Sequence, residues 1–148
     1  MPEEIPPRIV IDTQIVMDWL VFADPRLARL ADALATGQLE WIGSPAMLDE
    51  LRHVLGRGVA ANRQPDLPSI EATFARLCRT IEAEPAPAVR LVCRDPDDQK
   101  FIDLALAERA TWLLSRDKAV LALRKRALAF GLSIATIESW QKSRTPSS

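Results

Sequence analysis

The stretch Arg8-Ile9-Val10-Ile11-Asp12 decides the fold class of this chain. Its three consecutive β-branched residues favour an extended backbone, and an uninterrupted apolar run is typical of a strand that is buried on both faces. Three further short, largely apolar runs follow at 39–42, 111–114 and 132–135. Because amphipathic stretches separate them, the sequence predicts βαβ units. The expected fold is therefore α/β, a three-layer α/β/α sandwich with a central parallel sheet.

The segments between these strands carry helix signals. The pair Ser44-Pro45 offers an N-cap followed by proline at the first helical position. Residues 56–68 are predicted to form a polar loop, and residues 88–92 either a short strand or an irregular crossover. Apolar residues at helical spacing predict helices at 15–22, 25–36, 45–55, 69–82, 95–109, 118–130 and 136–142.

Length and composition are those of one globular domain. The chain has 148 residues, of which 48% are hydrophobic and 26% are charged, and this mixture suits a single packed core. We expect one domain over 1–148, with loose termini at 1–7 and 143–148. No apolar run is long enough to span a membrane, and the acidic start Met1-Pro2-Glu3-Glu4 is unlike a signal peptide. With only two cysteines in the chain, a reducing, cytoplasmic setting is expected.

Residue counts exclude several site chemistries. Two cysteines, Cys78 and Cys93, cannot build a disulfide framework, and the single histidine, His53, excludes a multi-histidine metal site. The formal net charge of −1 excludes a strongly basic nucleic-acid-binding domain. Any contact with nucleic acid must come from local basic residues, for which the candidates are Arg52, Arg57, Arg63, Arg116, Lys118 and the run Arg124-Lys125-Arg126.

Four carboxylates are placed where a solvated surface charge is not expected. Asp12 closes the first strand and Asp117 follows the third, so both should project from the carboxyl edge of the sheet. A rotation of 100° per residue puts Glu50 at the border of the apolar stripe of its helix, and Asp49 in water. The same count puts Asp98 within the apolar face of its helix, in the first turn.

Each carboxylate also has an ordinary structural role open to it. Asp12 and Asp117 can cap the helices that follow them, and Glu50 can be a solvated helix charge. Negative charge is favoured in the first helical turn, where Asp98 lies, although Asp95 before Pro96 is the better cap there. Four acids near one sheet edge nevertheless repel one another unless a cation is present. Oxygen ligands alone favour Mg²⁺ or Mn²⁺ over Zn²⁺.

Four segments of the chain carry recognisable motifs: Ile9–Thr13 (an opening strand and its aspartate), Ser44–Leu51 (S-P-x-x-x-x-E-L), Arg94–Ala105 (D-P-D-D-x-K-F-x-x-x-A) and Leu113–Lys118 (V-T/S-x-D-K). Together they resemble the motifs of the PIN-domain family. They occur in the family's order, with matching spacing, and extend over about residues 8–135. The subgroup that they resemble most is the VapC-like toxin components of bacterial toxin–antitoxin systems.

This resemblance implies a function and a site. It implies an Mg²⁺- or Mn²⁺-dependent endoribonuclease that hydrolyses RNA phosphodiester bonds, with Asp12, Glu50, Asp98 and Asp117 as the metal ligands and catalytic residues. It also implies a cognate antitoxin protein as partner, and it allows a homodimer. No membrane partner is implied.

Two positions depart from the family pattern and keep a second interpretation open. Gln14 stands where many members have asparagine, and Ala119 where many have a further acid. A protein-interaction module with a PIN-like fold and little nuclease activity would tolerate both changes. A third interpretation, a phosphatase with an aspartyl nucleophile, is disfavoured because the first strand ends in Asp12-Thr13-Gln14 rather than Asp-x-Asp.

Overall fold

The computed structural model describes residues 5–58 and 60–144. Within these residues, five strands form one sheet in the order β3-β2-β1-β4-β5, and every neighbouring pair is parallel. The strands are β1 (Arg8–Ile11), β2 (Glu40–Gly43), β3 (Cys78–Thr80), β4 (Trp112–Leu114) and β5 (Ser133–Ala135).

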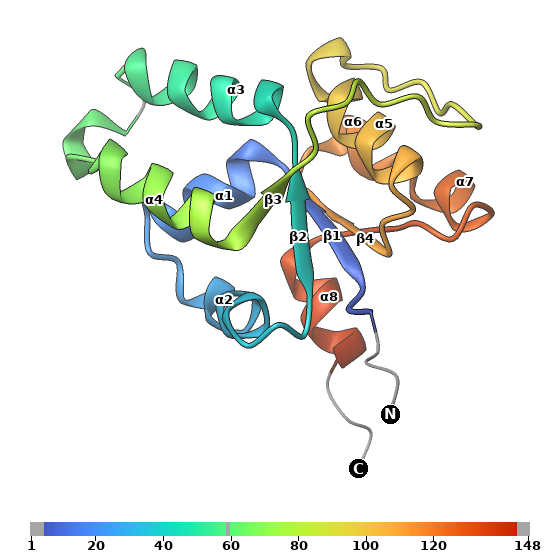
Figure 1. The fold of residues 1–148 in the computed structure, drawn as a ribbon, viewed down its shortest axis with the longest axis horizontal. Helices are drawn as coiled ribbons and strands as arrows, with labels where there is room; N and C mark the ends of the chain where they lie inside the picture. Colours follow the sequence, from blue (N-terminus) through green and yellow to red (C-terminus); the bar gives the residue numbers. More distant parts are fainter. Residues whose placement is uncertain (1–4, 59, 145–148) are drawn as a thin grey trace.

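Helices cover both faces of this sheet, as Figure 1 shows. Short 3₁₀ helices lie at Pro25–Leu27, Ala61–Arg63 and Pro96–Asp98. One face carries α1 (Thr13–Leu20), α2 (Ala28–Ala35), α3 (Pro45–Gly56), α4 (Leu67–Leu77) and α8 (Ile137–Arg144), and the other carries α5 (Gln99–Ala107), α6 (Lys118–Leu121) and α7 (Arg124–Leu128). The predicted three-layer α/β/α sandwich with a central parallel sheet is thus confirmed.

The alternation of β1 side chains explains why its sequence is apolar throughout. Ile9 and Ile11 belong to a core on one face of the sheet, and Val10 belongs to a second core on the other. Trp41 anchors the first core, with its ring edge-on to Phe74 at a centroid distance of 4.8 Å. A strand that is buried on both faces has no position for a polar residue until it ends, at Asp12.

The edge strand β3 contradicts one sequence-based expectation. The helix predicted at 69–82 ends at Leu77, and residues 78–80 pair with β2 instead. Leu77, Cys78 and Ile81 also fit helical spacing, so a three-residue strand left no distinct periodicity. Residues 88–92, the alternative strand candidate, form the irregular crossover, with Val89 and Val92 exposed.

Three predicted helices are also interrupted. The helix expected at 118–130 breaks at Leu123 into α6 and α7, although no glycine or proline marks the break. The helices expected at 25–36 and 95–109 begin as the 3₁₀ turns Pro25–Leu27 and Pro96–Asp98, before α2 and α5. The remaining elements start and end within about two residues of the expected bounds, as is usual for helix and strand ends. No helix among the described residues is long and apolar enough to cross a membrane.

The connectivity places β1 at the point where the sheet reverses its direction of growth. The chain passes from β1 to β2 and β3 on one side, and then returns to form β4 and β5 on the other. In open parallel sheets, ligands bind outside the carboxyl ends of the strands at such a reversal. The residues after β1 and β4 are Asp12 and the segment Ser115–Asp117, and they lie at this point.

Candidate metal centre

A cavity of about 520 Å³ opens at the carboxyl edge of the sheet. All four carboxylates singled out in the sequence line it, and two further aspartates from the 94–98 segment join them. The acidic lining residues are Asp12, Glu50, Asp95, Asp97, Asp98 and Asp117. The cavity is therefore strongly acidic, although the chain as a whole is almost neutral.

Asp12 lines this cavity and is buried, with 3% of its surface exposed. Its backbone N–H donates to the Leu114 carbonyl at 3.1 Å, which ties the end of β1 to β4. One carboxylate oxygen caps α1 by accepting from the Ile15 N–H at 3.0 Å, and the other accepts from the Ser115 hydroxyl. Burial raises the pKa of Asp12 to about 6, and these hydrogen bonds and the charge of Arg116 oppose that rise.

Ser115 links Asp12 to the last of the four carboxylates. Its side chain is fully buried. While its hydroxyl donates to Asp12, the same oxygen accepts from the Asp117 N–H at 3.0 Å. Asp117 in turn caps α6, because its Oδ1 accepts from the Ala119 N–H at 2.8 Å. A single hydroxyl thus fixes the loop after β4 relative to the end of β1.

Glu50 reaches the cavity from α3, whereas its neighbour Asp49 points away with 75% of its side chain exposed. This placement agrees with the helical periodicity. One Glu50 oxygen accepts from the Thr13 hydroxyl, and Oε1 pairs with the Lys100 ammonium at 3.1 Å. Lys100 also donates to the Asp97 carbonyl. Glu50 therefore carries its own counter-charge and is held to α1 and to the turn that precedes α5.

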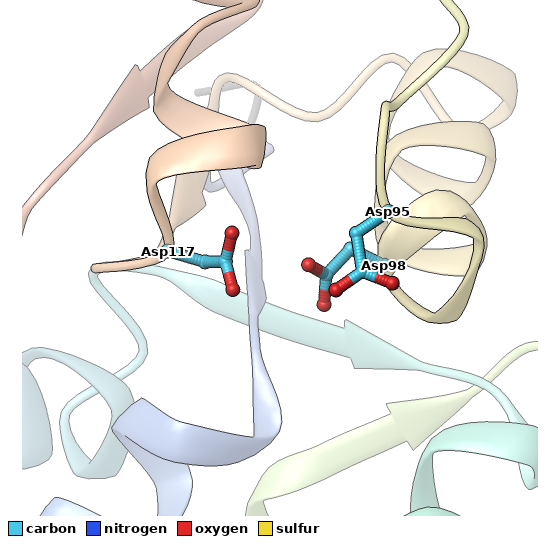
Figure 2. A group of neighbouring side chains, drawn as sticks. All are labelled: Asp95, Asp98 and Asp117. Atoms are coloured by element: carbon cyan, nitrogen blue, oxygen red, sulfur yellow. The ribbon is translucent and has the colours of Figure 1, made fainter.

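Asp98 lies beside two other carboxylates in the same part of the cavity. One oxygen each from Asp95, Asp98 and Asp117 fall within 4.8 Å of one another. Figure 2 shows the Asp117 carboxylate facing those of Asp95 and Asp98 across a gap between the start of α6 and the start of α5. Each of the three residues is half-buried, so solvent screens their repulsion incompletely.

Burial and the neighbouring carboxylates act together on the pKa of Asp98. Burial, reinforced by the negative charges of Asp117, Asp95, Asp12 and Glu50, raises the pKa of Asp98 to about 7. Its Oδ2 atom is buried and has no hydrogen-bond partner among the described residues. A buried carboxylate oxygen without a donor is costly, and a cation removes that cost.

Sequence reasoning gave Asp95 only a capping role. The structure shows that role, because Asp95 Oδ1 accepts from the Asp97 N–H at 3.0 Å, and it also places Asp95 in the carboxylate cluster. The signal was present in the motif Asp95-Pro96-Asp97-Asp98, where a cap and a ligand are not mutually exclusive. Ser115 and Lys100 were not predicted as site residues, because they contact Asp12 and Glu50 across 103 and 50 positions of the chain.

The donor set suits a hard divalent cation. Three convergent carboxylates at the same edge as Asp12, with no thiolate or imidazole in the cavity lining, match the oxygen ligands that Mg²⁺ and Mn²⁺ take. Of the two departures noted in the sequence, Gln14 is exposed and lines the cavity. Ala119 is buried, and its N–H donates to Asp117.

Comparisons with known proteins agree with this arrangement. The profile of the PIN domain matches residues 8–119, which is most of the chain and includes every carboxylate of the cavity. The chain belongs to the PIN-domain family. Among curated protein sequences there is no significant match.

Solved structures extend this PIN-domain assignment at the level of the fold. One similar chain comes from the crystal structure of VapBC2 from Rickettsia felis bound to a DNA fragment from their promoter. The two folds superpose with a TM-score of 0.58 at 15% sequence identity, over 86% of this PIN-domain chain and 98% of the other. At this identity the likeness concerns the fold alone.

Proposed function

We propose that this PIN-domain protein is an Mg²⁺- or Mn²⁺-dependent endoribonuclease and the toxin of a toxin–antitoxin pair. The observation that carries the nuclease proposal is the buried, unpartnered Oδ2 of Asp98 within a cluster of three carboxylates. Carboxylate clusters that hold divalent ions are a recurring device of nucleases. The antitoxin partner is supported by the fold shared with a VapBC2 chain.

In this proposal the carboxylates divide the work. Asp95, Asp98 and Asp117 would hold the metal, and Asp12 would add negative charge to the same cavity. A divalent ion bound there would supply charge stabilisation for the phosphodiester oxygens and an activated water, and would offset the repulsion between the acidic cavity and an RNA phosphate.

Other side chains keep the cavity in shape. The Ser115 hydroxyl fixes the loop that carries Asp117 against Asp12. Thr13 and Lys100 bind the Glu50 carboxylate from two sides, so the Glu50 side chain is already oriented toward the cavity. Such pre-organisation matters because small displacements of a catalytic group reduce rates steeply.

The test is cleavage of a mixed single-stranded RNA pool in Mn²⁺, followed on gels. Asp98→Asn keeps the shape of the side chain but removes the charge proposed to hold the cation. Asp12→Asn makes the same change at a buried carboxylate of the same cavity. Each substitution is expected to lower the cleavage rate by at least about a hundredfold. Asp49→Asn is the matched control, because this exposed neighbour of Glu50 points away from the cavity, and it should cleave as the wild type does.

Circular dichroism on every variant separates a lost site from a lost fold. Persistent cleavage by folded Asp98→Asn and Asp12→Asn would refute the assignment of these carboxylates. A wild-type protein that cleaves no RNA in any divalent ion would instead favour the protein-interaction module. For the toxin role, expression of the wild type should arrest bacterial growth, and expression of Asp98→Asn should not.

A further inference from the structure

A second cavity, of about 640 Å³, lies beside the acidic one and is lined differently. The two cavities share Gln14, Asp95, Arg116 and Asp117, so they adjoin at the carboxylate cluster. Three basic side chains line the second cavity: Arg94, Arg116 and Lys118. We call it the basic groove.

Two of its cations are free to bind an anion. Arg94 and Lys118 are exposed, and neither has an acidic partner within 4.0 Å among residues 5–58 and 60–144. Arg116 is different, because its Nε pairs with Asp18 at 3.1 Å. Arg94 and Lys118 come from opposite sides of the cluster, one just before Asp95 and the other just after Asp117.

The lining of the groove indicates what kind of ligand it suits. It contains no aromatic residue on which a base can stack; its remaining members are Gln14, Pro96, Ala119 and the two aspartates. Guanidinium and ammonium groups without base-reading partners bind phosphates regardless of sequence. The groove is therefore suited to a nucleic-acid backbone rather than to a base.

We propose that the basic groove holds the backbone phosphates of single-stranded RNA next to the bond that is cleaved at the carboxylate cluster, with Arg94 and Lys118 as the contacts. This inference rests on the proposed function, since it names how the same site takes its substrate. The acidic cavity repels phosphate, so the groove supplies the attraction that positions the strand beside it.

The experiment measures binding apart from cleavage. In the Asp98→Asn background, the affinity for a fluorescein-labelled mixed-sequence RNA of roughly ten nucleotides is measured by anisotropy in Mn²⁺ at several salt concentrations. Adding Arg94→Ala and Lys118→Ala should weaken binding by about tenfold and reduce the slope of log K against log salt by about 1.4, two single-strand phosphate contacts. Both residues are exposed, so the fold should be unaffected.

A matched control removes the same charge elsewhere. Arg29→Ala with Arg76→Ala changes the net charge equally at exposed positions of α2 and α4, outside the lining of both cavities, and should leave affinity and slope nearly unchanged. Equal losses in the two double variants, or no loss in either, would overturn the proposal. Competition by poly-glutamate as effective as that by unlabelled RNA would also overturn it, in favour of an acidic protein partner.

Failure of the groove and failure of the proposed function are distinguishable. In the otherwise wild-type protein, Arg94→Ala with Lys118→Ala should raise KM for RNA cleavage several-fold with kcat little changed, as expected for lost uniform binding. Wild-type cleavage with an unchanged KM in this variant refutes only the groove. Absence of cleavage by the wild type refutes the nuclease, whereas the anisotropy comparison still reports on the groove.

Discussion

At the scale of single residues, three carboxylates of the proposed metal site also cap helical turns, and the sequence alone presents these two roles as alternatives. Asp12, Asp95 and Asp117 each use one oxygen to accept a backbone N–H at the start of a helical turn. A carboxylate has about four acceptor positions, so capping leaves capacity for a cation. Capping also fixes the rotamer, and a fixed rotamer favours a metal ligand.

Asp98 differs from these three, because it has a buried oxygen without a donor, and its pKa is raised to about 7. Since this pKa exceeds the ordinary aspartate value of 3.8, the folded protein holds a proton between about pH 4 and pH 7 that the unfolded chain releases. The contribution of this bound proton to stability is fully present below about pH 4 and is lost as the pH rises through about 7. Asp12, whose pKa is raised to about 6, makes the stability of the fold decrease with rising pH in the same way.

We therefore predict that Asp98→Asn stabilises the metal-free protein at alkaline pH. In EDTA at about pH 8, the variant avoids the repulsion of an ionised Asp98, and its Tm should exceed that of the wild type by a few degrees. This corresponds to about 1–2 kcal/mol after allowance for partial exposure. The gain should shrink towards about pH 5, where Asp98 is protonated. Thermal melts at both pH values test this, and a gain that is equal at both would contradict it.

At the scale of elements, prediction from sequence depended on length and on periodicity. The strand at β1 and the helix at α3 were predictable because an uninterrupted apolar run and a Ser-Pro start leave few alternatives. The strand β3 was not predictable, since its three residues continue the helical spacing of α4 and become a strand only by pairing with β2. Tertiary pairing outweighed local propensity there.

The side chain of Cys78, at the start of β3, lies close to Gly43 of β2. A Cβ atom at position 43 would lie 2.8 Å from the Cys78 Sγ, which is buried beneath it. We predict that Gly43→Ala lowers the free energy of unfolding by about 1–3 kcal/mol, the usual cost of overpacking a core. Urea denaturation measures this cost.

A double-mutant cycle isolates the cause of that loss. Cys78→Ala removes the sulfur, so it should be destabilising in the wild-type background but should recover stability in the Gly43→Ala background. If the two substitutions are simply additive, the contact between them does not explain the loss. Gly43 immediately precedes Ser44 and α3, so the same packing sets the position of the helix that carries Glu50.

At the scale of the whole molecule, the fold extends beyond the part that the family profile recognises. The profile ends at residue 119, yet β5 completes the sheet and α8 buries Trp140 fully in the first core. The parallel sheet and its helical layers were predictable from the alternation of apolar and amphipathic segments. The pairing of Glu50 with Lys100 was not, because contacts between distant segments leave no local pattern in the sequence.

The carboxylate cluster concentrates repulsion in the folded state, and this leads to the last prediction. The carboxylates Asp12, Glu50, Asp95, Asp98 and Asp117 come together only in the folded protein. A divalent ion should therefore bind only the native state, and the free energy of unfolding should rise with the concentration of the ion. At a hundredfold excess over Kd the gain is about 2.7 kcal/mol, which corresponds to a rise in Tm of roughly 5–10 °C for a chain of this size.

Melting curves in EDTA, in Mn²⁺ or Mg²⁺, and in NaCl of matched ionic strength test this prediction. The rise should exceed that in NaCl, because screening alone acts weakly on half-buried charges. It should be largely lost in Asp98→Asn, which removes a ligand, and retained in Asp49→Asn, whose carboxylate faces solvent on the outer side of α3. Equal melting curves in EDTA and in excess Mn²⁺ would mean that the cluster binds no metal. A rise that survives in Asp98→Asn would place the ion elsewhere.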